Sequence, residues 1–172
     1  MKQIEALLFF NKMPEKIITL HNQDKHGAIA EFILYDLAHD KVFQLDKAAY
    51  LVDNPAFNCL KGVSGIARKE QGMKQFQDIW QEAESFNAFM KQSPFNQQVR
   101  GINTISVLAD DQARQLDDIA DELHLKNPVC VRWPMKYNNN GILLFEREEK
   151  LSPELQEHLA DGLHVLGLCH IH

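Results

Sequence analysis

The spacing of hydrophobic residues along the chain predicts several amphipathic helices. Between Gly27 and Ala38, apolar residues recur at i, i+3, i+4 and i+8, which places them on one side of a helix. Ser152 followed by Pro153 is typical of a helix start, because serine caps the first turn and proline suits the first helical position. Asp46 predicts a short helix in a similar way, ending before Pro55. The expected helices cover residues 27–38, 46–52, 72–91, 110–123 and 152–166.

Runs of apolar and β-branched residues between turn-forming residues predict the strands. Residues 4–10 and 17–20 flank the turn-like Asn11-Lys12-Met13-Pro14, so the simplest interpretation is an amino-terminal β-hairpin. The cluster Asn138-Asn139-Asn140-Gly141 predicts the turn of a second hairpin, because asparagine and glycine tolerate positive φ. Strands are expected at 102–108, 129–133, 142–146 and 168–172, residues 53–71 look irregular, and residues 92–101 have the composition of a linker.

The order of these elements predicts an α+β fold in two halves. Residues 102–172 read βαββαβ, the order of a ferredoxin-like sandwich in which two helices cover one face of an antiparallel sheet. Residues 1–101 form a mainly helical half that begins with the possible hairpin. With 172 residues and 45% apolar composition, the two halves are expected to share one core as a compact unit.

Composition bears on where the protein resides. No apolar run approaches the roughly 20 residues that a bilayer core requires, so a membrane partner is not expected. The three cysteines are odd in number, far apart and in no CxxC pair, and the first apolar stretch is too short for a signal peptide. These features predict a reduced, cytoplasmic protein.

Charge is distributed unevenly and bears on the choice of partner. Residues 1–101 hold twelve Lys and Arg against twelve Asp and Glu, whereas residues 102–172 hold six against twelve. The whole net charge of −6 therefore lies in the last 71 residues. Because Lys and Arg supply most of the affinity for phosphate backbones, nucleic acid is not an expected partner.

Histidines near the carboxyl terminus are candidate metal ligands. On a terminal strand, His170 and His172 would share one face, and either His164 or the terminal carboxylate of His172 would supply a further ligand for zinc or iron. The alternative is a strand that ends with polar residues on its solvent face, since an HxH pair alone has little specificity.

The stretch from 53 to 71 holds a candidate anion site and a candidate nucleophile. Gly62 and Gly65 would let backbone amides approach an anion, with Lys61 and Arg68 supplying positive charge. Cys59 lies beside this stretch, where neighbouring cations would favour its thiolate as a catalytic nucleophile. The alternative for Cys59 is a small buried hydrophobic residue, which is the commoner environment of a free cysteine.

The second predicted hairpin offers a surface for a ligand or partner. Trp133, Tyr137 and Asn139 combine aromatic rings and amides that stack and form hydrogen bonds. The acidic pairs Asp117-Asp118 and Asp121-Glu122 are interpreted as the solvated side of a helix.

No complete catalytic motif is present, so the favoured function is a non-catalytic module that binds a small molecule or a protein, with a possible homodimer. The first alternative is a metal-binding protein or metalloenzyme that uses the terminal histidines. The second is a thiol-dependent enzyme centred on Cys59.

Overall fold

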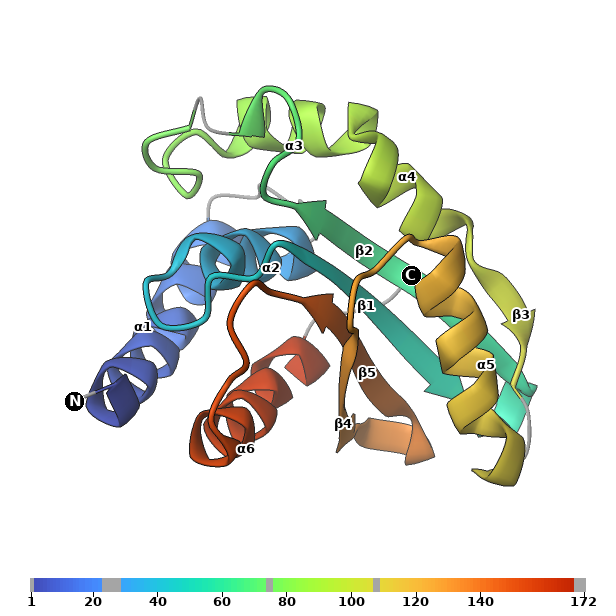
Figure 1. The fold of residues 1–172 in the computed structure, drawn as a ribbon. Helices are drawn as coiled ribbons and strands as arrows, with labels where there is room; N and C mark the ends of the chain where they lie inside the picture. The colour runs from blue at the N-terminus through green and yellow to red at the C-terminus, as the bar shows by residue number, and fades with distance from the viewer. Residues whose placement is uncertain (1, 23–28, 74–75, 107–108, 169–172) are drawn as a thin grey trace.

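The computed structural model describes residues 2–22, 29–73, 76–106 and 109–168, and it has an α+β fold (Figure 1). Five antiparallel strands form one sheet in the order β3-β2-β1-β5-β4, and helices pack on both of its faces. The strands are β1 (Lys47–Asn54), β2 (Cys59–Ala67), β3 (Asn103–Ile105), β4 (Val129–Pro134) and β5 (Asn140–Glu146). The α-helices are α1 (Lys2–Asn22), α2 (Ile29–His39), α3 (Ala83–Gln92), α4 (Pro94–Gly101), α5 (Ala109–Glu122) and α6 (Pro153–Gly162). Short 3-10 helices are η1 (Pro55–Phe57), η3 (Lys136–Asn138) and η4 (Leu163–Leu168).

The central strand β1 is buried on both faces and divides the interior into two hydrophobic clusters. Side chains alternate along a strand, so Tyr50 and Val52 enter one cluster while Ala49 and Leu51 enter the other. The larger cluster contains residues of α1, α2, α3 and α6. The smaller cluster contains residues of α4 and α5. The sheet is therefore the middle layer of three, as Figure 1 shows.

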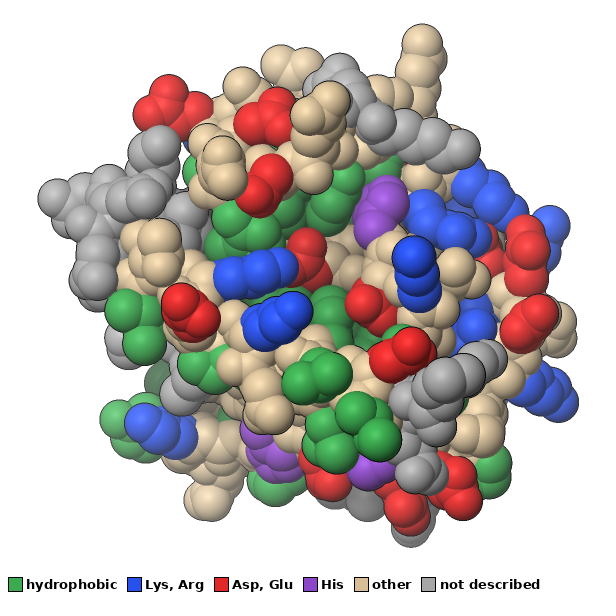
Figure 2. All heavy atoms as spheres, turned by 90° about the vertical axis from the view of Figure 1, so that its left-hand side faces the viewer, with side chains coloured by type: hydrophobic (Ala, Val, Ile, Leu, Met, Phe, Trp, Pro, Cys, Tyr) green, Lys and Arg blue, Asp and Glu red, His purple; other side chains and the backbone are tan. Residues whose placement is uncertain are grey.

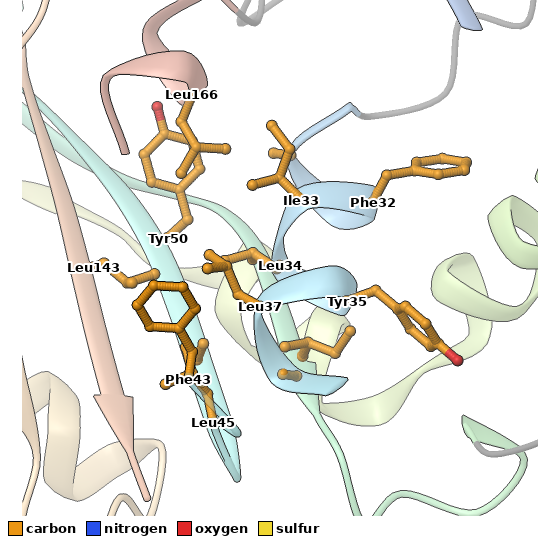
Figure 3. Packing of buried hydrophobic residues seen from close by; sticks show 14 of the residues in the cluster. Phe32, Ile33, Leu34, Tyr35, Leu37, Phe43, Leu45, Tyr50, Leu143 and Leu166 are labelled. Atoms are coloured by element: carbon orange, nitrogen blue, oxygen red, sulfur yellow. The ribbon is translucent and has the colours of Figure 1, made fainter. Parts of the chain in front are cut away.

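Helix α2 is the best buried helix, and its side chains point in two directions (Figure 3). Leu34 and Leu37 point toward the sheet, where Tyr50 lies. Phe32 and Tyr35 point away from the sheet and meet the ring of Phe86 in α3, with centroids 4.7 and 5.2 Å apart. The helix is thus held between the sheet and α3.

The predicted amino-terminal hairpin is wrong, because residues 2–22 form the single helix α1. Pro14 lies inside this helix, at a cost of about 3 kcal/mol relative to alanine. Burial of Ala6 and Met13 on one side of the helix offsets that cost. The helix packs closely on α6: a Cβ on Gly162 would lie 2.2 Å from Phe10 Cε2.

Three further predictions between residues 46 and 101 are also wrong, and a fourth is only partly right. The expected helix at 46–52 is the strand β1, whose two-sided burial removes the polar and apolar alternation that identifies a strand. The expected irregular stretch contains β2, and the expected linker contains α4, capped by the Ser93 hydroxyl, which accepts from Asn96 N. The helix expected at 72–91 is shorter, starting only at Ala83.

The other predicted elements are confirmed, with changed bounds. They are α2, α5, the hairpin of β4 and β5, and α6, whose first turn is capped by Ser152. β3 covers part of the strand expected at 102–108. The ferredoxin-like arrangement is not confirmed, because β3 pairs with β2 at the edge opposite to β4. Leu168 ends η4, and the rest of the predicted terminal strand lies outside the described residues.

Candidate functional site

A groove of about 750 Å³ lies between α5 and the edge strand β3. Its lining comes from two places in the chain, residues 101–104 at the end of α4 and the start of β3, and one side of α5. The lining residues are Gly101, Ile102, Asn103, Thr104, Asp111, Arg114, Gln115, Asp118, Ile119 and Glu122. In Figure 1, α5 and β3 lie together on the right of the molecule, and α1 lies on the left.

The α5 wall of this groove is negatively charged. Asp111, Asp118 and Glu122 are exposed, and Arg114 is the one cation among the residues that line the groove. Within the described part of the chain, none of these four side chains forms an ion pair. Their charges are therefore available to a ligand, and the excess of carboxylates favours a cationic one.

A buried carboxylate holds the start of α5 on the sheet. Asp53 of β1 is 4% exposed and accepts hydrogen bonds from Ser106 Oγ at 2.6 Å and Gln112 Nε2 at 3.0 Å. Arg132 of β4 donates in turn to Gln112 Oε1 at 2.6 Å. These contacts link α5 to two strands, so the first turn of the helix has a fixed position.

The end of α5 is held by side chains from β1 and α4. Lys47 Nζ lies 2.9 Å from the carbonyl oxygen of His124 and 3.3 Å from that of Leu123, where a cation meets the negative end of the helix dipole. Gln98 Nε2 donates to the Glu122 carbonyl at 2.8 Å. Both ends of α5 are therefore anchored, while the carboxylates along its groove side stay exposed.

The predicted anion-site residues lie on β2 or just after it, but α4 covers the two glycines. A Cβ on Gly62 would lie 1.8 Å from Val99 O, and one on Gly65 would lie 2.5 Å from Val99 Cγ2. Both glycines are thus explained by the close packing of α4 on the sheet. Lys61 is exposed, and Arg68 is bound elsewhere.

Arg68 forms an ion pair at the other end of the strand. Its Nη2 lies 2.6 Å from Asp46 Oδ1, and Lys69 Nζ lies 3.4 Å from the same oxygen. Burial alone would raise the pKa of Asp46, but the hydrogen bonds and charges of Arg68 and Lys69 together lower it. The ion pair between Arg68 and Asp46 therefore links the end of β2 to the start of β1.

Cys59 is half-buried at the start of β2, and its Sγ lies 3.4 Å from Asn103 Oδ1. His39, a histidine in the same half of the chain, donates from Nδ1 to the Tyr35 carbonyl at 3.0 Å, and its ring stacks on the Tyr35 ring with centroids 4.0 Å apart. Cys130 is exposed on β4.

Only part of the predicted metal site falls within the described residues. His164 is exposed on η4, whereas His170 and His172 lie outside the residues that the structure describes. Among the described residues, no group of three His, Cys, Asp or Glu side chains is placed to hold a metal ion.

The structure separates the three residues of the predicted hairpin surface. Trp133 is 2% exposed and stacks on Tyr50, with ring centroids 5.6 Å apart. Tyr137 is 89% exposed at the hairpin tip, with φ of 60°. Asn139 is half-buried, and its backbone N–H donates to the Lys136 carbonyl. Trp133 is therefore a core residue, and only the tip offers a surface.

A second buried carboxylate lies between α2 and α4. Glu31 is 3% exposed, accepts from Asn96 Nδ2 at 2.9 Å and lies 3.6 Å from Arg100 Nη1. Burial raises the pKa of Glu31, and the bond from Asn96 and the charge of Arg100 only partly oppose this. Because Asn96 Oδ1 also accepts from Gly65 N at 2.8 Å, this network joins α2, α4 and β2.

Hydrophobic side chains reach the surface on the side of the molecule where α1 lies (Figure 2). Ile4, Leu7, Leu8 and Ile18 of this helix are each more than half exposed. Single exposed apolar residues are common on protein surfaces, so this stripe does not by itself define a site.

The groove could not be predicted from the sequence, because its second wall, β3, lies beside α5 only in the folded protein. Asp111, Asp118 and Glu122 are spaced by seven and four residues, so a helical plot places them on one side of α5. This acidic stripe could have been found. Its position beside β3 depends on how α5 lies on the sheet, which the sequence pattern does not contain.

A scan against models of protein families, a search of curated proteins and a search of solved structures each found no match. No helix among the described residues is long and apolar enough to cross a membrane. The function of the chain is therefore inferred from the geometry of the groove.

Proposed function

We propose that the chain is a non-catalytic binding module that holds a positively charged segment of a partner protein in the groove between α5 and β3. The observation that carries this proposal is the set of three exposed carboxylates, Asp111, Asp118 and Glu122, along one wall of the groove. Fixed charges of one sign steer and select a partner of the opposite sign.

The nature of the walls favours a protein segment over a small molecule. Small-molecule sites are concave and lined mainly by apolar and aromatic side chains. Here the lining holds four charged side chains and no aromatic one. A smaller pocket of about 130 Å³, on the other side of α5 beside Cys130 and Arg132, lies below the roughly 300 Å³ typical of small-molecule sites.

A charge-reversal experiment tests the proposal, with a short synthetic peptide of alternating lysine and valine as the probe. The double variant Asp118→Lys/Glu122→Lys reverses two charges in the groove. The matched control Asp117→Lys/Asp121→Lys makes the same change on the same helix at positions outside the groove lining. We expect the groove variant to bind the peptide about tenfold more weakly than the control does.

The measurement is peptide affinity by isothermal titration calorimetry at low and at high salt. Binding by the wild-type protein should weaken as salt increases, because salt screens exposed charges. Equal losses in the two double variants, or no binding by the wild-type protein, would contradict the proposal.

A further inference from the structure

The edge of β3 that faces away from β2 carries backbone groups that have no partner strand. Gly62 N donates to the Ile102 carbonyl at 2.9 Å, and Ser106 N donates to the Asn58 carbonyl at 3.1 Å. In an antiparallel pair, hydrogen-bonded positions alternate with positions whose backbone groups point outward. Because Thr104 pairs with Leu60 between those two bonds, Asn103 and Ile105 are the outward positions.

One of these outward groups already has a partner from α5. Gln115 Nε2 donates to the Ile105 carbonyl at 2.7 Å. Within the described residues, no contact satisfies the N–H and C=O of Asn103 or the N–H of Ile105. Three main-chain groups thus remain at this edge, beside the groove.

The contact between Gln115 and Ile105 also fixes where the groove lies. Since Gln115 reaches an outward carbonyl of β3, the polar side of α5 lies next to the free edge of the sheet. A strand added to β3 would lie about 4.8 Å beyond it, next to the α5 carboxylates. Exposed edges of this kind accept peptides by strand addition.

The two faces of such an added strand would meet different surroundings. Thr104 lies opposite Leu60, which belongs to the hydrophobic cluster under α4 and α5, so guest side chains on that face meet the acidic wall of α5. Asn103 and Ile105 lie on the other face, and Ile105 is 67% exposed. The site therefore fits a strand with basic side chains on one face and apolar side chains on the other.

We infer that the partner segment binds as an added antiparallel β-strand on the outer edge of β3, with alternating basic and apolar residues. This inference rests on the proposed function, because it specifies how the groove holds its cationic segment. All four strand pairs in the sheet are antiparallel, and the added strand continues that pattern. Guest residues opposite Asn103 then carry the apolar side chains and direct their N–H and C=O groups toward β3.

Backbone-modified peptides test this inference without altering the protein. The alternating lysine and valine peptide is compared with two forms of it, one N-methylated at its valines and the other at its lysines. We expect methylation at the valines to weaken binding at least about tenfold, because those N–H groups face β3. Methylation at the lysines should change the affinity much less, since those amides face solvent.

A proline substitution tests the same contact from the side of the protein. Asn103→Pro removes the outward N–H, and Ile102 already has the extended backbone that a residue before proline requires, with φ of −67° and ψ of 116°. Asn103→Ala is the reference, because it loses the same side chain and keeps the N–H. We expect the proline variant to bind the unmodified peptide about tenfold more weakly than the alanine variant.

The outcomes separate this inference from the proposed function. Salt-sensitive binding that is weakened by Asp118→Lys/Glu122→Lys but is equal for all three peptides would overturn strand addition and leave the proposed function in place. Weaker binding of the lysine-methylated peptide than of the valine-methylated one would overturn the antiparallel arrangement. Absence of binding by the unmodified peptide would overturn both proposals.

Discussion

Gln112 of α5 donates a hydrogen bond of 3.0 Å to the buried carboxylate of Asp53 in β1. We expect Asp53→Ala to lower the free energy of unfolding by about 2–4 kcal/mol, because Ser106 and Gln112 would lose their buried acceptor. The measurement is urea-induced unfolding followed by circular dichroism. Asp117→Ala, an exposed position on the same helix, is the control and should change stability by less than about 0.5 kcal/mol. Similar small effects for both variants would show that Asp53 does not anchor α5.

Gly62 is required for the close approach of α4 to β2. Gly62→Ala would place a Cβ 1.8 Å from the Val99 carbonyl oxygen, so the helix must shift away from the sheet. We expect a loss of about 1–3 kcal/mol in stability from overpacking. Gly101→Ala is a matched control, because nothing lies within 4 Å of a Cβ at that position. Thermal unfolding of the two variants provides the comparison, and equal melting temperatures would contradict the packing argument.

Because Glu31 is buried, we expect the free energy of unfolding to depend on pH in a specific way. Its pKa is raised above the ordinary value of 4.5, chiefly because burial disfavours the charged form. A raised pKa means that the folded state binds the proton more tightly than the unfolded state. The stability supplied by Glu31 is therefore fully present below its unfolded-state pKa and is lost as pH rises through its folded-state pKa.

Glu31→Gln removes this titration and keeps an oxygen that accepts from Asn96. We expect the variant to gain stability relative to the wild-type protein as pH rises from about 4 toward neutrality. Denaturant unfolding of both proteins at a series of pH values measures the difference. A stability difference that stays constant over this range would show that Glu31 does not titrate with a raised pKa.

The two described cysteines differ in exposure, which predicts an order of reactivity. Cys130 is exposed, whereas Cys59 is half-buried beside Asn103. Alkylation requires access of the reagent to the sulfur, so we expect iodoacetamide to label Cys130 faster than Cys59 at neutral pH. Peptide mass spectrometry after brief labelling measures both rates. Faster labelling of Cys59 would instead support the alternative of a thiol-dependent enzyme.

The sequence predicted those elements whose local signals agree with their tertiary environment. α2 has a clear apolar stripe, α6 has a capping serine before proline, and the hairpin of β4 and β5 has asparagines at its turn. Each signal depends on neighbours within a few residues, so the pattern alone is sufficient.

The failures share a physical cause, which is that tertiary packing overrides a local signal. Pro14 indicated a turn, yet α1 continues through it because the helix packs on α6. β1 is buried on both faces, so its sequence lacks alternation. Gly62 and Gly65 indicated a loop or an anion site, but they lie in β2 beneath α4. The groove was missed for the same reason, because β3 and α5 meet only in the fold.

A map of amide chemical shifts by NMR, recorded during titration with the lysine and valine peptide, tests most directly whether a basic segment binds between β3 and α5. We predict that the largest changes occur at Asn103 and Ile105 of β3 and along the acidic side of α5, around Asp118. Changes centred on the hairpin tip at Tyr137 or on the exposed side of α1 would contradict it, as would a spectrum that the peptide does not change.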